Sequence, residues 1–294
     1  MICSSGRGNK DSLLHYMLDP SLTPRAAPPG SMRYFALLYA PADRREAAAA
    51  LFAIDAEIRE SAHGSNHDVA HTRLQWWRQE IDRLVNANPQ HPATRTLLAS
   101  PLDRRDYAKL HESIAAADMD LARMTYLDER ELRTYCARSG GVITELMAAL
   151  FAHPRTLDDT ARAAANRIGA LVRATEIVRD ARQDAYAGRL YVPLDLMERH
   201  GASHETFREK NTSVPARKAL QALAASIESD IDAALASIPV AMRAYLRPHF
   251  VLAGLHAALL ARIGQRDFDV GPERIELGPI RKPWVAWRSA HRAG

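Results

Sequence analysis

The sequence predicts an all-helical protein, and three observations support this fold class. Alanine, leucine, arginine and glutamate, which favour helix, are abundant along the chain. Apolar side chains recur every three or four residues almost to the C-terminus, which is the period of an amphipathic helix. No alternation of apolar and polar residues is long enough to indicate a strand. With 294 residues, 47% of them hydrophobic, the chain can form a large core.

The helical pattern divides the chain into successive elements. In the first long element, Leu51, Ile54, Ile58 and Ala62 share one face. The longest element ends at Gly188, a residue that commonly terminates helices. The expected helices cover residues 41–62, 68–85, 104–124, 128–151, 157–187, 214–237, 241–263 and 281–288.

The proline-rich segment 20–30 indicates a linker. It follows a short stretch with helical character. We therefore expect an N-terminal helix and linker over residues 1–30, followed by one helical domain over residues 31–294.

Composition excludes several classes of protein. The net charge of +4 is spread thinly, and no basic cluster with interleaved aromatic residues predicts nucleic-acid binding. Cys3 and Cys136 form neither a disulfide framework nor a zinc motif, which fits a reducing compartment. The polar start of the chain does not resemble a signal peptide, and the longest apolar stretch, 250–263, is too short to span a bilayer. We expect a cytoplasmic protein, with a peripheral membrane contact left open.

The longest expected helix carries an acidic stripe. Glu176, Asp180 and Asp184 are spaced i, i+4 and i+8, so they lie on one face. Like charges at this spacing destabilise a helix, which indicates that a positive group offsets them. One interpretation is a bound Mg²⁺, which takes carboxylate oxygens and bridges them to a diphosphate. The alternative is a solvated face balanced by arginines on the same helix.

The residues around this stripe carry a longer pattern. The run from Thr175 to Asp184 and the following Gly188-Arg189-Leu190-Tyr191-Val192-Pro193 resemble the second aspartate motif of the squalene/phytoene synthases. Segments 31–41, 51–57, 135–142 and 262–282 resemble other motifs of that family in the same order. The resemblance covers about residues 31–288.

This resemblance implies an isoprenoid-synthase (terpenoid synthase) helical bundle with a central cavity between two aspartate-bearing helices. Members of the family join two prenyl diphosphates head to head. By resemblance, Asp180 and Asp184 are catalytic and bind magnesium together with Glu176. The resemblance also implies substrate contacts from Ser31, Tyr34, Arg173, Arg189 and Tyr191. A nicotinamide cofactor is not indicated. Gly6-Arg7-Gly8 does not predict a dinucleotide-binding loop, because no strand is expected before it.

The first aspartate motif of the family is missing. Arg59 and His63 stand where that motif has carboxylates, and only Glu60 is acidic. On the second helix, Arg173 replaces a usual glutamine and Glu176 a usual asparagine.

Arg59, which we add to the catalytic candidates, has two possible roles. It pairs with Asp180 or Asp184 and closes the site, or it holds a diphosphate directly in place of a metal. We favour closure, because opposed carboxylates would lie nearer than any ligand. In that case Asp55, one helical turn earlier, orients the guanidinium.

The segment Leu74-Gln75-Trp76-Trp77-Arg78 resembles a divergent branch of the family that includes the mitochondrial complex I assembly factors. Two functions are therefore expected. The first is a protein that binds a prenyl diphosphate or another isoprenoid lipid, with head-to-head transfer weak or lost. The second is a non-catalytic factor that binds a lipid or a protein partner and acts in assembly.

Overall fold

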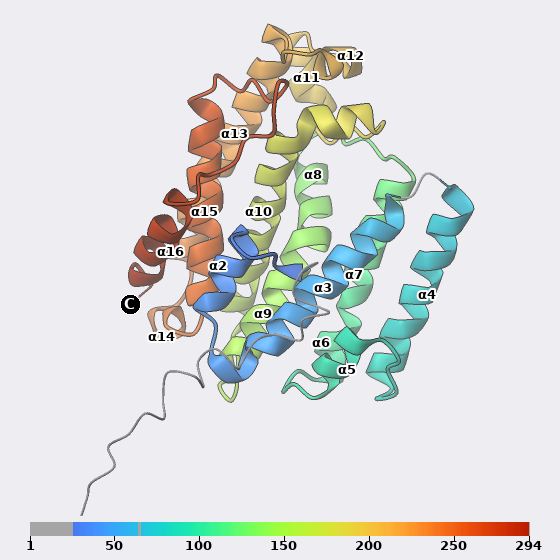
Figure 1. The fold of residues 1–294 in the computed structure, drawn as a ribbon, viewed down its shortest axis with the longest axis vertical. Helices are drawn as coiled ribbons and strands as arrows, with labels where there is room; N and C mark the ends of the chain where they lie inside the picture. Colours follow the sequence, from blue (N-terminus) through green and yellow to red (C-terminus); the bar gives the residue numbers. More distant parts are fainter. Residues whose placement is uncertain (1–25, 64–65, 294) are drawn as a thin grey trace, which may run out of the picture.

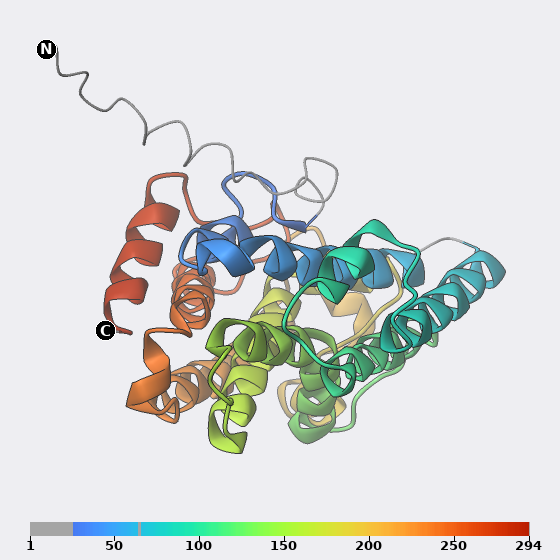
Figure 2. The same ribbon diagram turned by 90° about the horizontal axis from the view of Figure 1, so that it is seen from below.

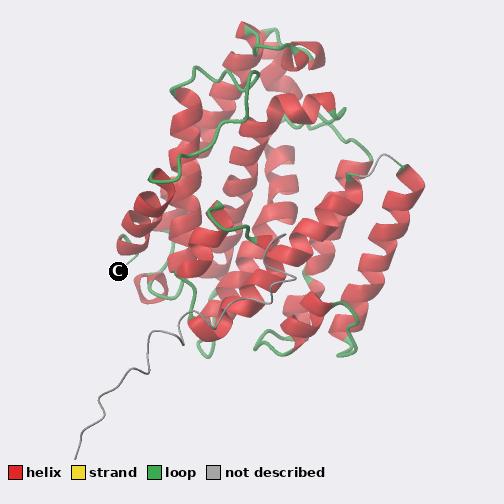
Figure 3. Cartoon of the chain, in the orientation of Figure 1, coloured by secondary structure: helices red, strands yellow, loops and turns green. Residues whose placement is uncertain are grey.

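The computed structural model describes residues 26–63 and 66–293, and it confirms the expected fold class. Helices connected by loops make up this part of the chain, and no strand occurs in it (Figure 3). The 28-residue helix α10 (Asp159–Tyr186) runs through the centre of the bundle and packs against α9, α13 and α15 (Figure 1).

The other helices surround α10. Seen from below, α2 and α3 lie on one side of the bundle, with α8 and α9 on the other (Figure 2). The remaining elements, in chain order, are α2 (Met32–Leu38), η1 (Ala42–Arg44), α3 (Arg45–Ala62), α4 (His67–Val85), α5 (Pro92–Leu98), α6 (Arg104–Ala108), α7 (Leu110–Leu121), α8 (Glu129–Cys136), η2 (Ala137–Gly141), α9 (Val142–Ala152), α11 (Leu194–His200), α12 (His204–Arg208), α13 (Val214–Ala236), α14 (Val240–Arg243), α15 (Arg247–Gly264) and α16 (Arg281–His291).

Most long helices lie where the periodicity predicts them, and the differences have local causes. The helix expected from Pro41 begins at Arg45, because Pro41 precedes a single 3₁₀ turn. The element expected at 104–124 is broken at Lys109 into α6 and α7. The element expected at 128–151 contains a π-helical turn, η2. Helices α5, α11, α12 and α14 have seven residues or fewer, too few to show a helical period.

The N-terminal helix of the expected first segment lies outside the described residues. The end of the expected linker is described, and it packs against the bundle. Ala26 and Ala27 are fully buried, and residues 28–30 line a cavity. The boundary between residues 30 and 31 stays a prediction.

The predicted apolar faces are buried. Leu51, Ile54, Ile58 and Ala62 are at most 1% exposed, and Trp77 is buried while its neighbour Trp76 remains partly exposed. Within the described residues, no helix is long and apolar enough to cross a membrane.

Two glycines allow α10 to cross η2 closely. A Cβ atom added at Gly169 would overlap the hydroxyl of Thr144 and the carbonyl oxygen of Gly140. The Thr144 hydroxyl donates to the carbonyl oxygen of Ala165, 2.8 Å away on α10. A side chain at residue 169 would therefore push α10 away from η2 and the start of α9.

We expect Gly169→Ala to lower the free energy of unfolding by about 2 kcal/mol, because the added methyl group overpacks this contact. Urea unfolding curves would measure the loss. Gly264→Ala is the matched control, since the nearest atom to its added Cβ is Cζ of Phe268 at 3.8 Å. An equal loss in both variants would show that the close helix crossing is not the cause.

Candidate functional site

A cavity of about 380 Å³ lies among α2, α3, α9, α10, α15 and the loop before α16. Its lining includes apolar residues and an unusual number of charged groups. The charged residues that line it are Arg33, Asp55, Arg59, Glu176, Arg179, Arg274, Glu276 and Lys282. The cavity occupies the space between the two helices that the family resemblance predicts to carry the site.

Arg59 connects the two helices across this cavity. Its Nε atom donates to Oδ1 of Asp55, 2.9 Å away on the previous turn of α3. Its NH1 group lies 3.4 Å from Oε2 of Glu176 on α10. Burial alone would lower the pKa of Arg59, but the Asp55 carboxylate and, to a smaller extent, Glu176 together outweigh burial and raise the pKa above the ordinary value. Arg59 therefore remains charged in the folded protein.

Asp55 is the buried carboxylate that pairs with Arg59 and also with Arg33. Its side chain is 2% exposed, and it also accepts from NH2 of Arg33 on α2 at 2.6 Å. A buried carboxylate is stable only when hydrogen bonds or opposite charges compensate its lost hydration. Arg33 and Arg59 supply this compensation, so α2 and α3 are held together at the cavity wall.

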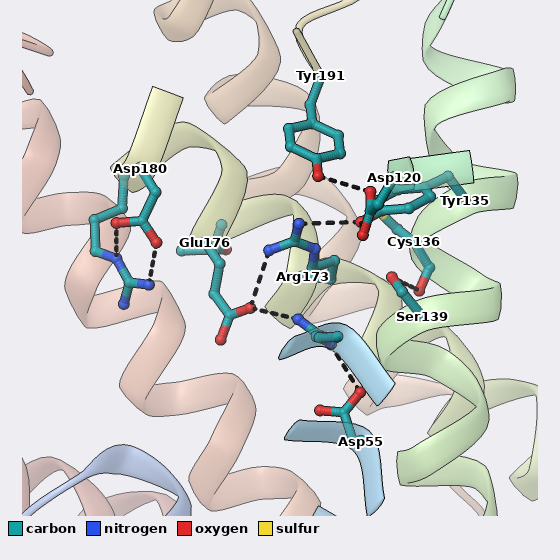
Figure 4. A network of polar contacts seen from close by, with 12 residues as sticks. Asp55, Asp120, Tyr135, Cys136, Ser139, Arg173, Glu176, Asp180 and Tyr191 are labelled. Atoms are coloured by element: carbon teal, nitrogen blue, oxygen red, sulfur yellow. Dashed lines mark hydrogen bonds and ion pairs between the residues drawn. The ribbon is translucent and has the colours of Figure 1, made fainter. Parts of the chain in front are cut away.

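Glu176 lies between two guanidinium groups. Arg59 approaches it from α3, and Arg173 approaches it from the preceding turn of α10 at 3.5 Å (Figure 4). Burial raises the pKa of Glu176, but Arg59 and then Arg173 lower it by more, so the pKa falls well below the ordinary value. Glu176 is therefore ionised throughout the physiological range.

Arg173 lies over a group of tyrosines. Its guanidinium carbon is 5.1 Å from the ring centroid of Tyr191, and its NH2 group donates to the hydroxyl oxygen of Tyr135 at 3.0 Å. Both tyrosine hydroxyls donate to the buried Asp120, at 3.1 Å from Tyr135 and 2.7 Å from Tyr191 (Figure 4). These contacts fix Arg173 in position and connect α7, α8 and α10.

Asp180 is neutralised by two arginines. It accepts from Nε of its neighbour Arg179 at 2.9 Å and from Nε and NH2 of Arg274 at 2.9 and 3.1 Å. These bonds outweigh burial and lower the pKa of Asp180. Asp180 lines a separate surface depression beside residues 270–274, not the cavity that holds Arg59.

Asp184 is in a different state from the other two acids. Its Oδ2 atom is buried and has no hydrogen-bond partner among the described residues. Burial is the main cause that raises its pKa to about 6, and Asp180 and Asp120 add to the shift. Arg189, a predicted substrate contact, donates to the carbonyl oxygen of Ala62 at 3.0 Å.

One expectation about this stripe is wrong. Arg59 pairs with Glu176 and not with Asp180 or Asp184, because Glu176 is the carboxylate of α10 that faces Arg59 across the cavity. Asp180 and Asp184 are not among the residues that line this cavity, and Arg274 binds Asp180 from the loop before α16. The expected orientation of Arg59 by Asp55 is confirmed.

The remaining predicted residues lie at varied positions. Ser31 lines the cavity and caps α2 by accepting from the backbone nitrogen of Tyr34 at 3.1 Å. Tyr34 packs edge-on against Phe35 and is not a lining residue. His63 turns back onto its own helix, with Nδ1 beside the carbonyl oxygen of Arg59. The assignment of substrate, catalytic and metal-binding roles to these residues stays a prediction.

The carboxylates present fit a magnesium cluster poorly. Within the described ranges, no group of three or more His, Cys, Asp or Glu side chains is placed to hold a metal ion. Glu176 and Asp180 already use their oxygens for arginines. A cation bridging these acids would have to displace those guanidinium groups.

Sequence reasoning did not identify three of the residues in this network. Arg33 and Asp120 contact the site from other helices, and Arg274 lies in a loop 94 residues from its partner Asp180. Tyr135 and Tyr191, which belong to segments that resemble the family, both donate to Asp120 and were the available signal for it.

We expect Arg59→Ala to lower the free energy of unfolding by about 3 kcal/mol, because Asp55 and Glu176 each lose one of the two guanidinium groups that compensate their buried charge. Chemical denaturation would measure this loss. Arg138→Ala is the control, since Arg138 forms an exposed pair with Glu112 that should contribute about 1 kcal/mol or less. A loss at Arg59 no larger than the control would contradict a bridging role.

Asp184 should make stability depend on pH. Its folded-state pKa of about 6 exceeds the ordinary 3.8, so the native state binds more protons than the unfolded state between these values. The contribution of Asp184 to stability is therefore greatest at the acidic end and is lost as the pH rises through about 6, by at most about 3 kcal/mol.

Asp184→Asn should remove this slope, which shows as a difference between the two proteins when unfolding is measured from about pH 4 to pH 7. Asp232→Asn, at an exposed position on α13, serves as the control. Parallel pH profiles for wild type and Asp184→Asn would disprove the assignment.

Two known proteins are similar to this chain in sequence over most of its length. The phytoene synthase of Mycobacterium tuberculosis is 27% identical over 283 residues, which cover 92% of this chain and 89% of that protein. Complex I assembly factor 6 of Bos taurus is 27% identical over 271 residues, covering 88% and 78% of the two chains.

Solved structures share the fold at lower identity. A dehydrosqualene synthase aligns with a TM-score of 0.76 and 16% identity over 89% of this chain and 91% of that one. A squalene synthase from Alicyclobacillus acidocaldarius aligns with a TM-score of 0.67 and 19% identity over 80% and 88%. The family model described as squalene/phytoene synthase matches residues 27–288, so the chain belongs to the squalene/phytoene synthase family.

Proposed function

We propose that this protein binds the diphosphate of a prenyl diphosphate through arginines in its cavity, and that head-to-head condensation is weak or lost. The observation that carries this proposal is the charge of the cavity wall. Five cationic side chains line it against three carboxylates; the cations are Arg33, Arg59, Arg179, Arg274 and Lys282, and the carboxylates are Asp55, Glu176 and Glu276.

A wall with this composition suits an anion. The planar guanidinium group of arginine matches phosphate oxygens in pairs and cannot lose its charge at physiological pH. Apolar side chains complete the cavity and offer a surface for an isoprenoid chain, among them Phe52, Ile143, Val172, Leu252 and Leu259. The volume of about 380 Å³ falls within the range common for small-molecule sites.

The same charges argue against efficient condensation. In the family, by resemblance, cations held between two acidic walls draw the diphosphate from an allylic carbon. Here Arg59 stands in the first wall, and arginines neutralise Glu176 and Asp180 in the second. Magnesium, which the family resemblance implies, would compete with these arginines for the same oxygens.

Two assays test this proposal. Purified protein incubated with farnesyl or geranylgeranyl diphosphate and magnesium should yield little or no condensed hydrocarbon by mass spectrometry. Calorimetry with a non-hydrolysable farnesyl thiodiphosphate, in the presence of a chelator, should show binding. Arg179→Gln should weaken that binding about tenfold, since it removes a charge-assisted hydrogen bond. Arg138→Gln, outside the cavity, should leave it unchanged.

Rapid magnesium-dependent formation of squalene or phytoene would overturn the second half of the proposal. Binding of the thiodiphosphate that requires magnesium and is unchanged in Arg179→Gln would overturn the first half, which assigns diphosphate binding to arginines.

A second candidate function is favoured by one observation. Similarity to complex I assembly factor 6 of Bos taurus extends over 88% of this chain, nearly as far as similarity to phytoene synthase. The alternative is a non-catalytic factor that acts through a protein partner or a bound lipid. Absence of both condensation and thiodiphosphate binding would favour this alternative.

A further inference from the structure

The outer face of α16 exposes a row of large apolar side chains. Ile280 is 85% exposed, Trp284 52% and Trp287 53%. Their spacing of four and then three residues places them on one stripe of the helix. Isolated exposed apolar residues are common, but three in one row, two of them tryptophan, form a continuous surface.

Cationic residues border this stripe. Arg281, Arg288 and Arg292 are exposed, and about 100° per residue places them along one flank of the stripe. The guanidinium carbon of Arg288 lies 4.7 Å from the ring centroid of Trp284. The helix from Arg281 to His291 contains no acidic residue. The surface is therefore apolar along its centre and positive along its edge.

The opposite face of α16 is fixed to the bundle. Val285, Ala286, Ser289 and Ala290 are buried, and α16 packs against α15 and α2. The contact with α15 is close, because Gly254 leaves room for the side chain of Ser289. Figure 1 shows α16 at the periphery of the bundle. The tryptophans therefore point away from the bundle, while the opposite face of α16 is packed against α15 and α2.

We propose that the outer face of α16, defined by Ile280, Trp284, Trp287, Arg281, Arg288 and Arg292, binds the surface of an anionic lipid bilayer. Tryptophan rings favour the headgroup region, where the ring is partly apolar and the indole N–H is hydrated. Arginines beside them attract anionic headgroups. A helix with this composition lies in the plane of the membrane and does not span it.

The position of α16 relative to the cavity adds a consequence. Lys282, on the inner side of α16, lines the cavity and lies 3.5 Å from Glu276. Ile275 and Leu277, just before α16, also line it. A bilayer bound at the outer face of α16 would therefore lie one helix away from the cavity in which we propose that an isoprenoid chain binds. This consequence rests on the proposed function, whereas membrane binding itself does not.

The test is co-sedimentation of the whole chain with vesicles that contain no isoprenoid. Vesicles of phosphatidylcholine and phosphatidylglycerol in equal parts are compared with phosphatidylcholine alone. We expect binding to the anionic vesicles, weakened by salt. The double change Trp284→Ser and Trp287→Ser should reduce the apparent affinity about tenfold or more, since it removes the apolar anchor.

A charge variant provides an independent arm, because it leaves the packing of α16 untouched. The triple change Arg281→Gln, Arg288→Gln and Arg292→Gln should reduce binding to anionic vesicles. Its control removes the same charge from exposed arginines elsewhere, through Arg104→Gln, Arg105→Gln and Arg130→Gln, and should bind like wild type. Circular dichroism melting curves check that each variant is folded.

Several outcomes would overturn the inference. These are absence of binding to anionic vesicles, binding that the two α16 variants leave unchanged, or equal losses in the α16 and control charge variants. Light scattering gives another: a dimer in solution that dissociates in the tryptophan variant would assign this face to self-association. Because the vesicles carry no prenyl diphosphate, failure of ligand binding in the cavity would not affect any of these results.

Discussion

The guanidinium group of Arg59 determines how the centre of this molecule is organised. It lies between Asp55 on its own helix and Glu176 on α10, and both acids are largely removed from water. Neither acid could remain ionised there without a cation nearby. The positive charge of a protein side chain thus neutralises carboxylates on both helices, and Arg59 connects α3 to α10 across the cavity.

This constraint separates the acids of α10 into distinct chemical states. Glu176 belongs to the cavity network, whereas Asp180 is held by Arg179 and Arg274 at a surface depression. Asp184 retains a buried oxygen that has no hydrogen-bond partner in the described part of the chain, and its pKa is about 6. The regularly spaced stripe therefore carries three different carboxylates. Glu176 and Asp180 are paired with different arginines, and Asp184 has a pKa of about 6.

The sequence predicts the features that depend on local pattern. The buried faces of α3 and α4 follow from helical spacing, and the Asp55–Arg59 pair follows from an interval of four residues. Periodicity does not reveal which carboxylate of α10 faces Arg59, because all three share one stripe and the crossing point of the helices decides between them. The contact of Arg274 with Asp180 is also beyond pattern, since it depends on the path of a loop 94 residues away.

The residues that depart from the family motif contact one another in the structure. Arg59, Arg173 and Glu176 replace an aspartate, a glutamine and an asparagine in the pattern that the chain resembles, and Glu176 contacts both arginines. A neutral residue at 176 would remove the carboxylate that pairs with Arg173 and leave Arg59 with Asp55 alone, and Glu176 without the two arginines would be a poorly compensated buried anion. Each replacement is electrostatically acceptable only with the others. In this arrangement the charges of Arg59, Arg173 and Glu176 balance one another within the protein, at the positions where the family resemblance implies a different set of residues.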